Sequence, residues 1–89
     1  MAGCKLVTYD LRKPGKDYNS LINAIKEYGT WAKVCESVWI IKSNNTCVSI
    51  RDNLFQYMDS NDKRFVASLT GEAAWKNVFC ENKWLTDNL

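Results

Sequence analysis

The order of strand-like and helix-like segments is the feature that most constrains how this chain can fold. Residues Lys5 to Leu11 are rich in β-branched and aromatic side chains and predict a strand. The Pro14-Gly15 pair predicts a loop, and a helix follows, with Asp17 as its N-cap and Gly29 as its left-handed C-terminal cap. The apolar side chains of this helix recur at helical spacing, at Tyr18, Leu21, Ile22, Ile25 and Tyr28.

The remaining segments complete the order strand, helix, strand, strand, helix, strand. Residues Thr30 to Lys42 are β-rich and too long for one ordinary strand, so two strands are predicted, with a turn near Cys35 to Ser37. Thr46 is expected to cap a second helix, and Phe65 to Leu69 to form the fourth strand. Apolar residues of the second helix are Cys47, Ile50, Leu54, Tyr57 and Met58.

This order predicts an α+β fold of the ferredoxin-like βαββαβ type. Right-handed crossovers give a four-stranded antiparallel sheet with the first and third strands in the centre and both helices on one face. The 89 residues make a single domain, with a core over residues 1–71 and a C-terminal extension over residues 72–89. That extension is expected to continue the sheet at Ala73 to Trp75 and to form a short helix at Lys83 to Leu89.

Composition narrows the location and the chemistry of the protein. The chain is 46% hydrophobic and 25% charged, which is typical of a globular domain, and its net charge of +2 gives no strong attraction to nucleic acid. The opening residues do not resemble a signal peptide and no segment approaches a membrane span, so a cytoplasmic protein without membrane contact is expected.

The chain contains no histidine, which excludes Ser-His and Cys-His catalysis. Its four cysteines lie far apart, at Cys4, Cys35, Cys47 and Cys80, and include no Cys-x-x-Cys pair. Free thiols are therefore expected rather than a zinc site or disulfides. Any catalysis would depend on carboxylates, with a divalent metal, or on lysine or tyrosine.

The predicted third strand indicates a partner. A sheet with helices on one face should alternate apolar and polar residues, yet Val38, Trp39, Ile40 and Ile41 are apolar on both faces. A homodimer packed sheet to sheet through these four residues would cover the second face. The alternative is that Trp75 and Trp84 of the C-terminal extension fold back over it.

Asp10 is the candidate catalytic and metal-binding residue. It ends a central strand just before a loop, and two copies in a symmetric dimer could share Mg²⁺ or Mn²⁺, which would activate water or steady a phosphate leaving group. Arg12, Lys13 and Lys16 follow it and are candidates for holding a phosphate backbone. The alternative is an aspartate that caps a turn beside a solvated basic loop. Asp52, Asp59 and Asp62 are interpreted as surface and capping residues.

Three short motifs carry a family resemblance: Thr8-Tyr9-Asp10-Leu11, Glu27-Tyr28-Gly29 and the run from Glu36 to Ile40. They resemble the small ferredoxin-like CRISPR-associated adaptation protein, and also its relatives on the same fold, the virulence-associated protein D ribonucleases. The resemblance implies a homodimer with facing sheets. It also implies either a metal-dependent nuclease that uses the aspartate matching Asp10, or a non-catalytic scaffold that grips DNA. The tail after Gly71 departs from the family's closing strand.

Three functions follow from these observations. The leading one is a small homodimeric module that binds nucleic acid or a protein partner without catalysis. The first alternative is a metal-dependent endoribonuclease or endonuclease that uses Asp10 of both subunits. The second is an interaction protein of phage–host conflict, connected with a defence system, which size and fold permit but no residue specifically indicates.

Overall fold

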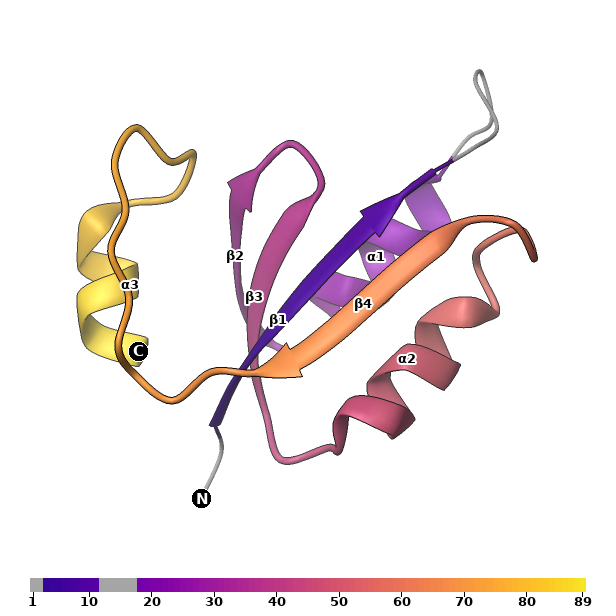
Figure 1. The fold of residues 1–89 in the computed structure, drawn as a ribbon, viewed down its shortest axis with the longest axis horizontal. Helices are drawn as coiled ribbons and strands as arrows, with labels where there is room; N and C mark the ends of the chain where they lie inside the picture. Colours follow the sequence, from indigo (N-terminus) through magenta and orange to yellow (C-terminus); the bar gives the residue numbers. More distant parts are fainter. Residues whose placement is uncertain (1–2, 12–17) are drawn as a thin grey trace.

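The computed structural model describes residues 3–11 and 18–89, which form a four-stranded sheet and three helices (Figure 1). The elements in chain order are β1 (Gly3–Asp10), α1 (Asn19–Lys26), β2 (Thr30–Cys35), β3 (Val38–Ser43), α2 (Cys47–Phe55), β4 (Lys63–Ser68) and α3 (Asn82–Asn88).

The sheet has the strand order β2-β3-β1-β4, and each neighbouring pair is antiparallel. The central strands are β1 and β3, and the register places Val7 of β1 between Trp39 of β3 and Val66 of β4. The sequence prediction of an α+β fold with ferredoxin-like order is therefore confirmed. The sheet is open, so β2 and β4 are its edges.

Local sequence signals account for two of the helix ends. Gly29 follows α1 with a φ of 96°, a conformation that glycine adopts without steric cost. The Thr46 side chain accepts a hydrogen bond of 3.1 Å from the backbone N–H of Ser49 and caps α2 as predicted. Asp17, the expected cap of α1, lies outside the described residues.

The main core lies between α1, α2 and one face of the sheet. Val7, Trp39 and Ile41 supply the sheet side of this core, and buried residues of the two helices supply the other, at Leu21, Ala24, Ile25, Ile50 and Leu54. The indole N–H of Trp39 donates a hydrogen bond of 3.0 Å to the Tyr9 hydroxyl, which satisfies the polar group of a side chain that is otherwise buried.

A second, smaller core lies on the opposite face. Cys4, Ile40 and Leu85 are buried there, and α3 packs on the side of the sheet away from α1 and α2 (Figure 1). The Phe79 N–H donates a 2.9 Å hydrogen bond to the Val34 carbonyl, at the outer edge of β2, and the Cys4 thiol donates to the Asn88 carbonyl at 3.1 Å. The C-terminal segment, residues 72–89, is thus attached to the sheet at several points.

The predicted C-terminal helix agrees with α3, but the predicted strand at Ala73 to Trp75 was wrong: these residues are in no helix or strand. Trp75 instead donates an indole hydrogen bond of 3.0 Å to Asn82 at the start of α3. No helix in the part of the chain that the structure describes is long and apolar enough to cross a membrane.

Candidate functional site

The four residues predicted to form a dimer interface lie largely inside one chain. Trp39 and Ile41 are 2% and 0% exposed and face the two helices, and Ile40 is 6% exposed beneath the C-terminal segment. Val38 is partly buried. Over β2 and β3, the chain's own tail therefore does the covering, as the alternative interpretation of Trp75 and Trp84 anticipated. The homodimer remains a prediction, and it requires a surface other than these residues.

The face of the sheet opposite α1 and α2, which the tail covers over β2 and β3, is open over the outer ends of β1 and β4. Five residues share this face in register, with Asp10 opposite Lys63, Thr8 opposite Phe65, and Ala67 further along β4. We call these five residues the open half-face. Phe65 is 61% exposed, which is unusual for a phenylalanine in a sheet, and it lies directly opposite Thr8 of the neighbouring strand.

Asp10 lies at the exposed end of β1, beside a shallow hollow of about 190 Å³. The hollow is lined by Thr8, Tyr9, Asp10, Lys63, Arg64 and Phe65. Arg64 is held on the helix side, because its guanidinium stacks 4.0 Å from the centroid of the Phe55 ring and donates to the Asp62 carbonyl at 3.0 Å. Lys63 is exposed and is the cation directly across from Asp10 in the sheet.

The donors of one chain do not fit a divalent metal at this position. Magnesium and manganese require several oxygen ligands, and carboxylates supply them best. Within residues 3–11 and 18–89 no three His, Cys, Asp or Glu side chains converge, and the cross-strand neighbour of Asp10 is a lysine. Arg12, Lys13 and Lys16, the predicted phosphate-binding residues, lie outside the described residues.

Asp62 differs from its sequence interpretation as a surface residue. It is 3% exposed, and its carboxylate accepts hydrogen bonds from the Tyr18 hydroxyl at 3.1 Å and from the Asp59 N–H at 2.8 Å. These bonds connect the start of α1 with the loop before β4, so Asp62 stabilises the fold. Asp52 is exposed, as predicted, and forms an ion pair of 2.9 Å with Arg51.

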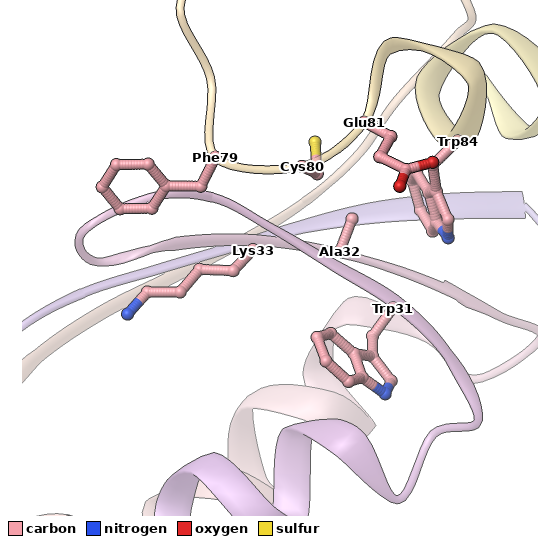
Figure 2. Close-up of a pocket in the computed structure, with 7 residues that line it drawn as sticks. All are labelled: Trp31, Ala32, Lys33, Phe79, Cys80, Glu81 and Trp84. Carbon is pink, nitrogen blue, oxygen red and sulfur yellow. The ribbon is translucent and has the colours of Figure 1, made fainter.

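A second hollow of about 260 Å³ runs along the outer edge of β2 (Figure 2). Trp31 forms one wall, and Phe79, Cys80 and Trp84 of the C-terminal segment form the other. Burial raises the pKa of the Cys80 thiol, which keeps this sulfur in its neutral form. Because Trp31, Phe79 and Trp84 line it, the hollow is an aromatic groove, and we call it the β2-edge groove.

Sequence reasoning missed both surfaces. The run Lys63-Arg64-Phe65 was a usable signal for the open half-face, since two basic residues directly precede an aromatic one in a predicted outer strand. No comparable signal pointed to the β2-edge groove. Trp31 and Trp84 are far apart in the chain, and only the path of the C-terminal segment makes them line one groove.

All four cysteines are free, as expected, although only Cys4 is buried. Burial raises the pKa of the Cys4 thiol, and the positive charges of Lys42 and Lys5 oppose part of this effect.

No family model matches the sequence, and no solved structure matches it.

Proposed function

We propose that this protein is a homodimeric binding module that acts without catalysis, and that its two copies meet through the open half-face. The exposed ring of Phe65 carries this proposal. A phenylalanine on the surface of a sheet loses about 1.5–3 kcal/mol of favourable burial, which a second copy would recover. Thr8 and Ala67, both partly buried already, flank the ring with small side chains that a partner can approach closely.

Charge supports self-association at this surface. Asp10 and Lys63 are opposite in charge and lie across from one another on neighbouring strands. A two-fold interface is self-complementary, so each residue contacts the same partner residue on both sides. Two copies placed around Phe65 can therefore pair Asp10 of each with Lys63 of the other, with no like charges opposed.

Nucleic acid is the ligand that best suits such a dimer. Lys63 is engaged with Asp10 in this interface, whereas Arg12, Lys13 and Lys16, which follow Asp10 within a few residues in the sequence, are not among its five residues. Dimerisation doubles this set of positive charges and brings it to one assembly, which offsets the modest net charge of +2 on each chain. Contacts of this kind are made to phosphates and depend strongly on salt.

The oligomeric state tests the proposal most directly. Sedimentation equilibrium of the purified protein should show a dimer, and Phe65→Ser should yield a monomer of unchanged fold. Phe79→Ser is the matched control, because Phe79 is 63% exposed but lies on the C-terminal segment. A wild-type monomer at micromolar concentration contradicts the proposal, as does a Phe65→Ser variant that remains dimeric.

The nucleic-acid part has a separate test. Binding of a short duplex and of a single strand should weaken steeply as salt increases, and the double variant Arg12→Ala with Lys13→Ala should reduce the salt dependence by about two phosphate contacts for each chain. No measurable affinity at low salt contradicts this part and leaves the dimer standing.

A metal-dependent phosphodiesterase is the second candidate, and the position of Asp10 favours it. Asp10 belongs to the open half-face, so a dimer that met there in a different alignment, with the two Asp10 side chains at the axis in place of the Asp10–Lys63 pairs, would bring two carboxylates together. Asp10→Asn should then abolish Mg²⁺-dependent cleavage of RNA or DNA while the dimer survives. Cleavage at the wild-type rate by this variant rejects the candidate.

A further inference from the structure

The β2-edge groove differs from the open half-face because a strand backbone forms its floor. β2 is an edge strand, and Figure 2 shows Trp31 below the strand and Trp84 above it, with Ala32 between them. Phe79 occupies the far end of this edge, where its N–H bonds to the Val34 carbonyl at 2.9 Å. In the part of the chain that the structure describes, the edge beside Trp31 and Lys33 has no second strand.

The register shows which backbone groups face the groove. Tyr9 donates to the Ser37 carbonyl, so the odd-numbered residues of β1 direct their hydrogen-bonding groups toward β3. Directions alternate along an antiparallel ladder up to the register shift between Lys33 and Cys35, which means that Ile40 of β3 faces its partner Ala32 of β2. The backbone N–H and C=O groups of Trp31 and Lys33 consequently point outward into the groove.

We propose that this groove binds an extended, acidic peptide segment of a partner protein, which adds to the sheet beside β2. Strand addition uses main-chain hydrogen bonds for affinity and side-chain pockets on alternate sides for specificity. The outward groups of Trp31 and Lys33 supply the bonds, and the walls at Trp31 and Trp84 supply the pockets. The site is independent of the dimer proposal, since it lies at the opposite edge of the sheet.

Charge complementarity selects an acidic segment. The Lys26 ammonium lies 4.8 Å from the centroid of the Trp31 ring. The Lys33 ammonium lies 5.6 Å from the centroid of Trp39, which shares the face of Trp31, and 5.9 Å from that of Phe79 at the far end of the edge. The other side presents Phe79, Cys80 and Trp84. A bound strand therefore meets two ammonium groups with one set of its side chains and an apolar wall with the alternate set.

Among residues 3–11 and 18–89, Glu81 is the one acidic side chain that lines the groove, and it comes from the C-terminal segment near Trp84 (Figure 2). It disfavours acidic residues on the apolar wall. The preferred peptide sequence thus alternates acidic with aliphatic residues, and it binds with the acidic residues toward the ammonium groups and the aliphatic residues toward the apolar wall.

The probe for the test is a synthetic peptide as long as β2 in which aspartate and valine alternate, with both ends blocked. Titration into the full-length protein, followed by backbone amide NMR, should give saturable shifts at Trp31 and Lys33, with those amides becoming protected from exchange. A peptide of alternating lysine and valine should bind at least about tenfold more weakly. The aspartate–valine peptide with every residue N-methylated should lose most of its affinity, because it lacks all of its main-chain donors.

Two protein variants locate the site. Phe79→Ser should weaken peptide binding about fivefold or more by removing an aromatic wall. Phe65→Ser is the control and should leave peptide binding unchanged, because Phe65 is about as exposed as Phe79 but lies outside the groove. The proposal is overturned if the aspartate–valine peptide does not bind at about millimolar concentration, or if N-methylation or Phe79→Ser has no effect. It is also overturned if a thymidine oligonucleotide, but not the peptide, shifts the groove residues.

Discussion

The face of the sheet that points away from α1 and α2 has two halves, and the chain covers only one of them. Over β2 and β3, the C-terminal segment buries Ile40 and Leu85 to 6% and 2% exposure. Over β1 and β4, Phe65 remains 61% exposed beside Asp10 and Lys63. The chain leaves β4 at Ser68, turns near Gly71 and docks at the far edge of the sheet. The C-terminal segment covers one half of the face, and Phe65 in the other half stays exposed.

The largest effect on stability is expected from truncating Leu85, the buried residue of α3 in the covered half. Leu85→Ala deletes a side chain that is 2% exposed, and should lower the free energy of unfolding by about 2–5 kcal/mol through lost burial and the cavity left behind. Urea denaturation measures the loss. Phe65→Ala, measured on the monomer, should cost no more than about 0.5 kcal/mol. Equal losses for the two variants would remove the distinction between the halves.

The turn that directs the tail is the next target. Gly71 has a φ of 103°, and although an added Cβ would meet nothing within 4 Å, a side chain there adopts a strained backbone conformation. Gly71→Ala should therefore destabilise the protein by about 1–3 kcal/mol. Gly3→Ala is the control, because the nearest atom to its added Cβ is the flexible Lys5 ammonium at 3.9 Å. A neutral Gly71→Ala would mean that the tail docks without this turn.

A smaller effect is expected inside the C-terminal segment. Trp75→Phe removes the indole N–H that bonds to the Asn82 side chain at 3.0 Å, and should cost about 1 kcal/mol. Asn82→Ala removes the acceptor, so a double-mutant cycle isolates the bond. A coupling energy of zero would show that this bond does not help to fold the tail onto the sheet.

The smallest expected effect is a pH dependence at Cys4, whose thiol donates to the Asn88 carbonyl beneath the tail. Burial raises the pKa of Cys4 in the folded protein above its usual value of 9.0, so the unfolded chain releases this proton first as pH rises. The stabilisation is fully present below pH 9 and is lost as pH increases through the raised value.

The measurement is the free energy of unfolding at neutral pH and at about pH 10. Cys4→Ala should lose less stability over this interval than the wild type does, whereas Cys35→Ala, at an exposed thiol, should match the wild type. Identical losses in all three proteins would contradict a role for Cys4 in this pH range.

Most of the fold was predictable because its signals are local. The apolar spacing in α1, the glycine after it and the threonine before α2 each determine backbone geometry within a few residues. The strand order then follows from handedness rules. Asp62 was not predictable as a buried residue, since its burial depends on Tyr18, which is far from it in the chain.

The candidate site was predictable only in part. Asp10 was identified from its place at the end of a strand, and the structure adds that it shares a face with Lys63 and Phe65. The apolar run from Val38 to Ile41 correctly indicated that both faces of β3 are covered. It could not indicate what covers them, because a hydrophobic pattern records burial without recording the partner.

The sequence by itself determined the elements, their order and the need to cover both faces of the central strand. The tertiary structure decided that the tail covers β2 and β3, that Phe65 stays exposed, and that Trp31 and Trp84 line one groove. The physical reason is the range of the interactions. Helix periodicity and capping act over a few residues, whereas the docking of a tail depends on surfaces that exist only after the sheet has formed.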